Sequence, residues 1–482
     1  MSRPSFHDVI IVGSSPAALM TADLLCRMDY RVLVIGQGQH GGTYNDHGIR
    51  LQARPFILPP YGHSKVLDEV LKDMGIEDPV HVVGEDHEPP IQLVTPDQRI
   101  DLFSSPSALS SEIKRAFPKQ ADHCTEIIGE LRGLDERFRQ VLSGKPRLPP
   151  KSIRERSGMK RALGELGAHE LPPVQQWPLV MRILVAAVSF YSRLDEKMRP
   201  PFVTGHAVLG LLGGLRTVPD FDRLLEQAVE KNGGEIEKKI VADQIHMEKR
   251  RAVGIQTLRG EKTYGCKALV SSLSIDQTLD LIPLGRRHKR LLAASSSVRQ
   301  SAGLFVVNLI LPSEILPLGM GKQLFVVRNP DEPLIEGNLI RVHCSRLEER
   351  IGRAVVNLSC VIPYRKRTLG REYLGPLQKQ LLDTAEWLIP FMNEHLQNQS
   401  SPFWKGRSGD EPHPAPWSIH PIFETERAID LGCSILGTET PYKNLFYCGP
   451  EAMPGLGQEG AAYAAVQVAE AVCEQVKLKR LL

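Results

Sequence analysis

The sequence has almost no excess charge of either sign, with 59 lysines and arginines against 56 aspartates and glutamates and a net charge of +3. A nucleic-acid-binding surface requires clustered basic residues, so we expect no nucleic-acid partner. Long apolar runs are also missing. The longest, WPLVMRILVAAVSFYS at 177–192, contains Arg182 and is shorter than the roughly 20 residues that a membrane span requires.

We also expect no secretory leader, since a strand-like run begins at Asp8 with no charged segment or cleavage site before it. The eight cysteines form no CxxC pair, and several lie in apolar runs, such as Cys448 in NLFYCG. Reduced core thiols are therefore expected rather than disulfides or metal ligands. Together these absences predict a cytoplasmic protein, with contact at a membrane surface left open.

The common catalytic motifs are absent too. The sequence contains no GxSxG, no HExxH, no P-loop and no cluster of histidine, cysteine and aspartate at metal-ligand spacing. It therefore assigns no catalytic residue and predicts no bound metal. What remains is the composition of an ordinary globular protein, with 42% hydrophobic and 24% charged residues in a chain of 482. That length suffices for two or three domains.

The N-terminal stretch DVIIVGSSPAALMTADLLCRMDYRVLVIG, residues 8–36, changes its hydrophobic period twice. VIIVG is a continuous apolar run, which is typical of a buried parallel strand. A helical stretch follows, in which Ala18, Ala22 and Leu25 share one face, and VLVIG is a second buried strand. This pattern predicts a βαβ unit whose first turn, at Gly13, can hold a dinucleotide pyrophosphate at the helix N-terminus.

The rest of the chain alternates between helical and strand-rich segments. Residues 105–200 are expected to be helical, and one amphipathic helix within them has an apolar stripe formed by Ile127, Leu131, Leu134, Phe138 and Val141. Apolar runs between 302 and 363 predict a sheet. The chain closes with NLFYCGPEAMPGLGQEGAAYAAVQVAEAVCEQV, which reads as a strand, a glycine-rich turn and an alanine-rich helix.

Three segments, in this order, resemble the flavin-dependent oxidoreductases of the phytoene desaturase and amine oxidase type. They are the βαβ unit ending in the pair Gly41 and Gly42, the stretch GGLRTVPDFDRLLEQAVEKNGGEI, and NLFYCGPEAMPGLGQEGA, which is similar to the family's C-terminal flavin loop. The resemblance spans nearly the whole chain. It implies an α/β fold in which a Rossmann-type FAD/NAD(P)-binding domain is interleaved with an α+β substrate domain that contains a mixed β-sheet and a helical insertion.

On this resemblance the chain divides into five parts, and the helical insertion would cover a channel beside the flavin. The parts are the dinucleotide-binding βαβ part, 1–104; the helical insertion or lid, 105–200; the second part of the dinucleotide-binding domain, 201–290; the sheet and helix of the substrate domain, 291–425; and the C-terminal flavin loop and helix, 426–482.

The resemblance places a cofactor site at the glycine-rich loops. Gly13 allows a tight turn at the end of the first strand, and Pro16 suits the first turn of the helix. A side chain at Gly457 is expected to enter the space of the flavin edge or to distort the turn. The expected cofactor-binding residues are Gly13, Ser15, Pro16, Ala17, Ala18, Gly36, Gln37, Gly41, Gly42, Thr43, Ala242, Gly449, Glu451, Gly455, Leu456 and Gly457.

Two features depart from the family pattern. Ser15 stands where a second glycine usually lets the backbone approach the pyrophosphate, so its side chain is expected to crowd the cofactor. The second strand ends at Gly36 and Gln37, where such units normally carry an acid that binds the adenosine ribose. Losing a charged acceptor removes about 1.5–3 kcal/mol per hydrogen bond. The Gln37 amide or a backbone carbonyl could replace part of this, and a glutamate at Gly36 is expected to restore it.

The resemblance therefore implies an FAD-dependent oxidoreductase that dehydrogenates or isomerises a small apolar substrate, such as an isoprenoid or a carotenoid-like molecule. Such chemistry needs a dry channel more than an acid–base pair, because the flavin accepts the hydride. The alternative is a binding protein of the same fold with no cofactor, similar to the Rab GDP-dissociation inhibitors. The departures at the first loop favour this alternative, whereas the intact C-terminal loop favours the enzyme.

Overall fold

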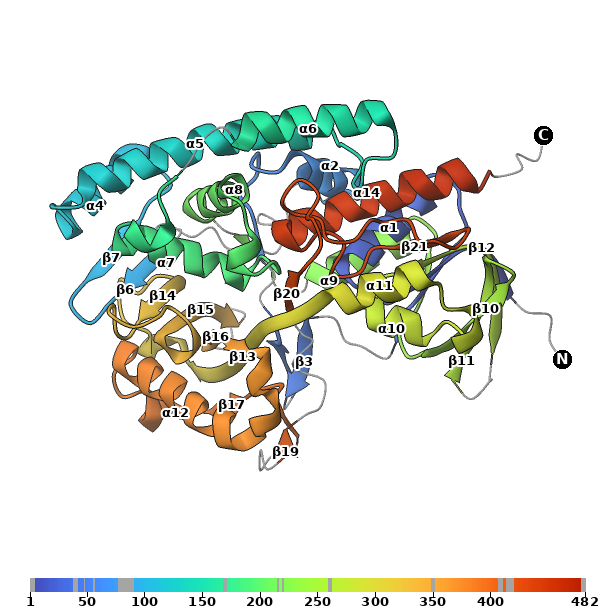
Figure 1. The fold of residues 1–482 in the computed structure, drawn as a ribbon. Coiled ribbons are helices and arrows are strands. Elements are labelled where there is room, and N and C mark those ends of the chain that lie inside the picture. The colour runs from blue at the N-terminus through green and yellow to red at the C-terminus, as the bar shows by residue number, and fades with distance from the viewer. Residues whose placement is uncertain are drawn as a thin grey trace.

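The computed structural model describes residues 5–37, 42–46, 48–54, 57–76, 91–167, 171–214, 216–218, 221–258, 262–347, 352–405, 411–412 and 420–477. Two β-sheets form the two halves of the molecule, and a row of helices runs along one side of both (Figure 1). Parallel and antiparallel strands both occur, so the fold is mixed α/β, as the resemblance implies. None of the helices in the described ranges is long and apolar enough to cross a lipid bilayer.

The first sheet contains the two apolar runs predicted at the N-terminus. Its strands are β1 Ser5–Val12, β2 Val32–Ile35, β9 Glu235–Glu237, β10 Ala242–Glu248, β11 Arg251–Thr257, β12 Thr263–Ser271 and β21 Leu445–Tyr447. Their order is β10-β11-β12-β1-β2-β9, and β21 also pairs with β12. The strands from β12 to β9, together with β21, are parallel, whereas β10 and β11 are antiparallel additions.

Helices enclose the first sheet and bury its apolar strands. They are α1 Pro16–Cys26, α2 Lys65–Asp73, α9 Phe221–Lys231, α10 Ile275–Asp280, α11 Lys289–Ser297 and α14 Gly457–Gln475. Helix α1 packs against both α9 and α14. All of its residues except Leu24 are buried, because it lies between the sheet and these two helices.

The second sheet is mainly antiparallel. Its strands are β6 Ile91–Val94, β7 Arg99–Leu102, β13 Val298–Pro312, β14 Gln323–Val327, β15 Leu339–Leu347, β16 Arg353–Pro363, β17 Asn398–Ser400 and β20 Ile422–Thr425. Their order is β17-β13-β16-β15-β14-β6-β7, and β20 also pairs with β13. Strand β6 pairs in parallel with β14, so residues 91–102 belong to this sheet, although the sequence grouped them with the dinucleotide-binding part.

Short strand pairs and further helices complete the described chain. The strand pairs are β3 Thr43–Asp46 with β4 Ile49–Gln52, β5 Ile57–Leu58 with β8 Arg216–Thr217, and β18 Trp404–Lys405 with β19 Glu411–Pro412. The helices are α4 Pro106–Ala116, α5 Ala121–Ser143, α6 Ile153–Gly167, α7 Leu179–Ala187, α8 Pro201–Leu212, α12 Gly370–Leu388 and α13 Met392–His395. Helix α12 packs on one face of the second sheet through an apolar cluster.

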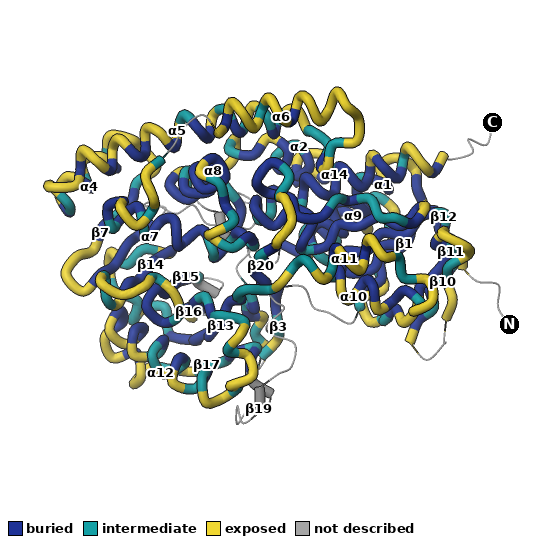
Figure 2. Tube along the Cα trace, in the orientation of Figure 1, coloured by how far each residue is buried: buried dark blue, intermediate teal, exposed yellow. Residues whose placement is uncertain are grey.

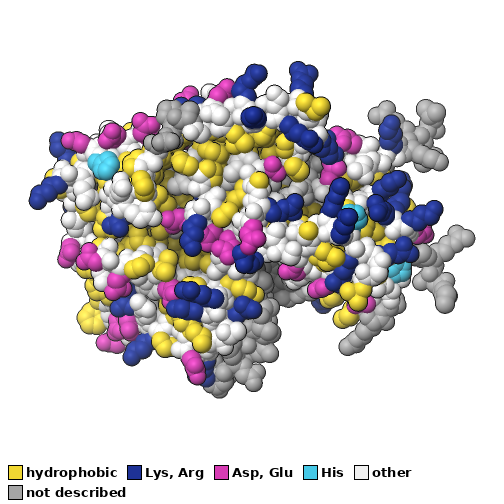
Figure 3. Space-filling model, in the orientation of Figure 1, with side chains coloured by type: hydrophobic (Ala, Val, Ile, Leu, Met, Phe, Trp, Pro, Cys, Tyr) yellow, Lys and Arg dark blue, Asp and Glu magenta, His cyan; other side chains and the backbone are white. Residues whose placement is uncertain are grey.

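The row formed by α4, α5 and α6 is amphipathic. The stripe predicted in the sequence faces inward in α5, where Ile127, Leu131, Leu134 and Phe138 are buried and Val141 is half-buried. The outer faces of α5 and α6 are exposed (Figure 2). Beneath them hydrophobic side chains gather over the region of α7 and α8, while acidic and basic side chains are interspersed over the rest of the face drawn (Figure 3).

A buried polar chain ties the second sheet to the strand that follows the second glycine loop. The guanidinium of Arg341, which is 0% exposed, donates hydrogen bonds to Gln323 at 3.0 Å and to Asn357 at 3.3 Å. Asn357 donates to Asn308 at 2.8 Å, and Asn308 donates to the hydroxyl of Tyr44 at 3.0 Å. Because Tyr44 is in β3, this chain fixes the segment directly after Gly42.

Asn444 fixes the start of β21, the strand that leads into the C-terminal loop. It is buried with a φ of 55°; it accepts a hydrogen bond from the Ala252 N–H at 3.1 Å and donates to the carbonyls of Ala252 and Lys267. Replacing Asn444 by Ala strains the turn and leaves these groups unpaired, so we expect the free energy of unfolding to fall by about 2–4 kcal/mol. Urea unfolding checks this against the exposed control Asn393→Ala, and equal stability of the two variants would contradict it.

Candidate functional site

The turn after β1 has the geometry that holds phosphate groups at a helix N-terminus. Gly13 has a φ of 95°, and a Cβ atom there would overlap Ser272 Oγ, so the turn requires glycine. Ser15 caps α1, since its Oγ accepts a hydrogen bond from the Ala18 N–H at 3.3 Å. The buried first turn of the helix consists of Pro16, Ala17 and Ala18. Ser15 thus binds an N–H group that a phosphate oxygen could otherwise use.

At the end of β2 the structure brings two of the expected site residues together. Gln37, with a φ of 60°, accepts a hydrogen bond from the Ala242 N–H at 2.8 Å through its side-chain oxygen. The amide that could replace the missing ribose acceptor is therefore bound to the protein's own backbone. The expectation that a glutamate at Gly36 restores this acceptor is wrong, because a Cβ atom there would lie 2.8 Å from Lys238 Cα.

At the second glycine loop, Gly41 lies outside the described residues, and Gly42 and Thr43 are buried. The Gly42 N–H donates to Asp222 Oδ2 at 2.9 Å, and Thr43 Oγ1 accepts from Arg50 Nε at 2.9 Å. Burial raises the pKa of Asp222, although the nearby Arg54 charge opposes this. Asp222, in the first turn of α9, was not predicted, since nothing in the sequence shows that it lies against Gly42.

In the C-terminal loop, Glu451 is bound within the protein. It is buried, its Oε1 accepts a hydrogen bond from the Ile275 N–H at 3.2 Å, and its Oε2 accepts one from the Tyr447 hydroxyl. Burial raises the pKa of Glu451 to about 7. A Cβ atom at Gly449 would overlap Leu273 O and the Tyr447 hydroxyl. The start of this loop is therefore packed against the end of β12 and its own strand.

The remaining loop residues form the turn before α14, and Leu456 in this turn is buried. A Cβ atom at Gly455 would lie 2.7 Å from Cys433 Cα. Gly457 has a φ of 56°, and a Cβ atom there would lie 2.9 Å from Tyr191 O. Of the two effects expected of a side chain at Gly457, the structure therefore supports distortion of the turn, because Tyr191 already occupies the adjacent space.

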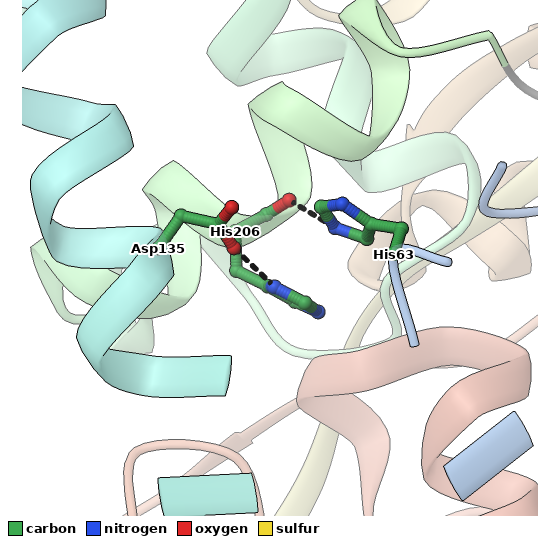
Figure 4. A group of neighbouring side chains, drawn as sticks. All are labelled: His63, Asp135 and His206. Atoms are coloured by element: carbon green, nitrogen blue, oxygen red, sulfur yellow. Dashed lines mark hydrogen bonds and ion pairs between the residues drawn. The ribbon is translucent and has the colours of Figure 1, made fainter. Parts of the chain in front are cut away.

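A buried ionic cluster, not predicted from the sequence, joins three helices beside this loop. His206 of α8 contacts Asp135 Oδ1 of α5 through Nδ1 and Glu459 Oε2 of α14 through Nε2, both at 2.7 Å. Figure 4 shows the contact between His206 and Asp135. Burial opposes a charged imidazole, but the two carboxylates outweigh it and raise the pKa of His206 to about 9. His206 therefore carries a positive charge at neutral pH.

His63 completes the cluster as a neutral group. Its ring stacks on that of His206 with centroids 4.3 Å apart, and its Nε2–H donates to the His206 carbonyl at 3.0 Å (Figure 4). Burial and the charge of His206 lower the pKa of His63 to about 4. Arg139 pairs with Asp135 at 3.0 Å, so two cations balance the carboxylates of Asp135 and Glu459.

The ligand atoms of His63, Asp135 and His206 lie within 4.8 Å of one another, close enough to suggest a metal. Both nitrogens of His206 are, however, hydrogen-bonded to carboxylates, and the charges already balance. A protonated ion pair therefore explains the cluster. The sequence signal was a lone histidine in the apolar helix PFVTGHAVLGLL, since a buried ionisable group requires a partner.

A small cavity lies between this cluster and the C-terminal loop, with room for about one water molecule. Its lining residues are Ile57, Pro59, His63, Tyr191, His206, Ala207, Gly210, Gly455, Leu456, Gln458 and Glu459. Because Glu459 is in the first turn of α14, the ionic cluster fixes the helix end that follows the loop.

The raised pKa of His206 predicts a pH-dependent contribution to stability. This contribution is fully present below the ordinary histidine pKa of 6.5 and is lost as the pH rises through about 9. His206→Gln leaves two buried carboxylates without their cation, so we expect the free energy of unfolding to fall by about 3–5 kcal/mol near pH 6 and by less near pH 10. Urea unfolding at both pH values measures this, with the exposed His123→Gln as control; a loss of the same size at both would contradict it.

No protein-family model and no curated protein sequence matches this chain. Solved structures do match it. An oxidoreductase from Methanosarcina mazei is 15% identical, with 96% of this chain and 100% of that chain covered and a TM-score of 0.60. Cyclohexylamine oxidase from Brevibacterium oxydans is 12% identical, with 98% and 100% covered and a TM-score of 0.60. Putrescine oxidase bound to putrescine is 14% identical, with the same coverage and a TM-score of 0.61. The chain thus shares its overall fold with these oxidoreductases.

Proposed function

We propose that this chain is an FAD-dependent oxidoreductase. The observation that carries the proposal is the N-terminus of α14. Its N-cap is Leu456, which offers no side-chain acceptor, so the first backbone N–H groups of this 19-residue helix have no side-chain cap. Oxygen atoms of a flavin ring would satisfy them, and the helix dipole favours negative charge at this end. The fold shared with two amine oxidases, one of them solved in a redesign of its cofactor binding, supports a redox enzyme with a bound cofactor.

The residues of the site fit two parts of FAD better than the third. The turn at Gly13 and the N-terminus of α1 fit the pyrophosphate, and Ser15 is partly exposed there. The first N–H groups of α14 match the oxygen atoms of a flavin ring, but the cavity beside them has room for about one water molecule, so the ring would enter only if the lining side chains moved. The ribose would need the Gln37 amide to exchange its hydrogen bond with Ala242, since no carboxylate ends β2. Binding would therefore depend mainly on the phosphate and ring contacts.

The bound flavin would supply the hydride acceptor, while the chain's own residues bind and orient it. The ion pair of Glu459 with His206 holds the first turn of α14 in place. Glu451 has a pKa near 7, so it can carry a proton beside the loop at neutral pH. Helices α7 and α8 carry mainly apolar buried side chains, which supports an apolar body of the substrate and exclusion of water. The proposed reaction is dehydrogenation or isomerisation of such a substrate, of an isoprenoid or carotenoid-like kind.

One observation favours the second candidate, a cofactor-free binding protein of the same fold. Polar groups of the expected site already bind one another. The side-chain oxygen of Gln37 accepts a hydrogen bond from the Ala242 N–H, and Asp222 accepts one from the Gly42 N–H. A protein that had lost its cofactor would gain from such internal bonds, because buried polar groups need partners.

Ser15→Asp tests whether the loop after β1 holds the phosphates of FAD. Aspartate caps helices as well as serine, so the variant should stay folded with an unchanged melting temperature. Its negative charge would lie beside the pyrophosphate, and we expect the affinity for FAD to fall about tenfold or more. Ser15→Gly serves as the matched control, because it removes the crowding side chain and should bind FAD as tightly as the wild type or more tightly.

The measurement is a titration of cofactor-stripped protein with FAD, followed by flavin fluorescence. If wild type, Ser15→Gly and Ser15→Asp all bind FAD equally, the loop after β1 does not hold the phosphates. If none of the three binds FAD, the binding-protein candidate is the better account.

A further inference from the structure

The segment that leads from α10 into α11 combines several cations with exposed leucines. It reads LGRRHKRLL, residues 284–292, and contains no acidic residue. Leu284, in a short 3-10 turn, is 80% exposed, and Leu292 of α11 is 43% exposed. Leu292 shares a helix face with Lys289, because residues three apart on a helix are neighbours. The exposed cations of the segment are Arg286, Lys289 and Arg290.

The fold brings two other basic parts of the chain beside this segment. The Tyr442 hydroxyl donates to the Arg286 carbonyl at 2.8 Å and accepts from the His288 N–H at 2.7 Å. The N–H of the next residue, Lys443, donates to the Arg250 carbonyl at 2.8 Å. Since Arg250 is in the turn between β10 and β11, cations from three distant parts of the sequence meet at one edge of the first sheet.

The exposed cations of these three parts form one surface, which we call the basic patch. Its residues are Lys249, Arg250, Arg286, Lys289, Arg290 and Lys443. On the face drawn in Figure 3, Lys and Arg side chains lie close together over α11 and the adjoining edge of the first sheet. Partial burial and the charges of Arg250, Arg290 and Lys289 lower the pKa of His288, which agrees with this arrangement.

Acidic side chains do not neutralise the basic patch. None of its six side chains forms an ion pair with another residue in the part of the chain that the structure describes. Of the acids nearby, Asp280 pairs with Arg287 at 3.2 Å, and Glu439 pairs with Arg147 at 3.4 Å. Glu248 is the one acid in the turn that joins β10 to β11. Positive charge is therefore in local excess, although the whole chain is nearly neutral.

We propose that the basic patch docks on a bilayer surface that contains anionic lipids, with Leu284 entering the boundary between headgroups and acyl chains. Lysine and arginine side chains bind to such a surface through its negative potential, and an exposed leucine gains free energy by leaving water. The leucines favour a membrane over a nucleic acid, whose phosphates border no apolar phase. This proposal does not depend on FAD, although a bilayer could also hold the apolar substrate proposed above.

Sedimentation of the full chain, as purified, with lipid vesicles tests the docking. One set of vesicles consists of phosphatidylcholine, and the other contains phosphatidylglycerol as well. We expect at least about tenfold tighter binding to the anionic vesicles, and we expect added salt to weaken it because salt screens the charges. Equal binding to both sets, or binding to neither, would overturn the proposal.

Two variants test the cations and the leucine separately. The triple variant Arg286→Gln, Lys289→Gln, Arg290→Gln should bind the anionic vesicles at least about tenfold more weakly than the wild type. Leu284→Ser keeps every charge and should weaken the binding about threefold or more, because only the apolar contact is lost. If neither variant weakens the binding, another surface of the chain contacts the lipid and the proposal is refuted.

The matched control removes the same charge from a different surface. It is the triple variant Arg154→Gln, Lys160→Gln, Arg161→Gln on the exposed side of α6, which should bind the vesicles as the wild type does. If the control loses as much binding as the variant of the basic patch, net charge alone attracts the chain and the patch is refuted. Because all six residues are exposed, we expect both triple variants to melt at the temperature of the wild type.

Two further measurements identify the partner and separate this proposal from the proposed enzyme. If a DNA duplex binds through the basic patch and vesicles do not, the partner is a nucleic acid and lipid docking is refuted. The variants should keep the flavin content of the wild type, since the patch lies outside the glycine loops. A colourless chain that binds anionic vesicles through the patch would refute the proposed enzyme and leave the docking surface standing.

Discussion

The buried charge of His206 is the interaction on which the arrangement around the C-terminal loop depends. It joins α5, α8 and α14, which come from widely separated parts of the chain, through two contacts of 2.7 Å. Since Glu459 is in the first turn of α14, this ion pair sets where the first N–H groups of that helix point. The helical row of α4 to α6 is thereby tied to the loop that would hold the flavin ring.

The glycines of the cofactor loops do not by themselves show that a cofactor is bound. At Gly13, Gly36, Gly449, Gly455 and Gly457, an added Cβ atom would meet protein atoms rather than open space. Packing alone therefore requires glycine at these positions, in an enzyme or in a binding protein. The polar groups are more informative. Gln37 and Asp222 accept hydrogen bonds from the protein's own backbone, whereas among the described residues no side chain caps the first turn of α14.

The βαβ unit, the apolar stripe of α5 and the C-terminal loop and helix could be predicted because their signals are local in the sequence. The ionic cluster could not, since Asp135 and Glu459 lie 71 and 253 positions from His206. The same limit applies to β6, whose apolar run does not reveal its partner strand. The same limit explains why the expected benefit of a glutamate at Gly36 was wrong. The atoms that a side chain there would meet belong to Lys238, which is far along the chain. Residue types and the local hydrophobic periodicity predict helices and strands. Contacts between residues far apart in the sequence determine which polar groups remain available to bind a ligand.

We propose that this fold still holds FAD between its two glycine loops. The most direct test is the visible absorption spectrum of the protein purified without added cofactor, followed by identification of whatever small molecule denaturation releases. We expect a yellow protein that releases FAD in an amount equal to that of the chain. A colourless protein that also fails to take up FAD on reconstitution would contradict it.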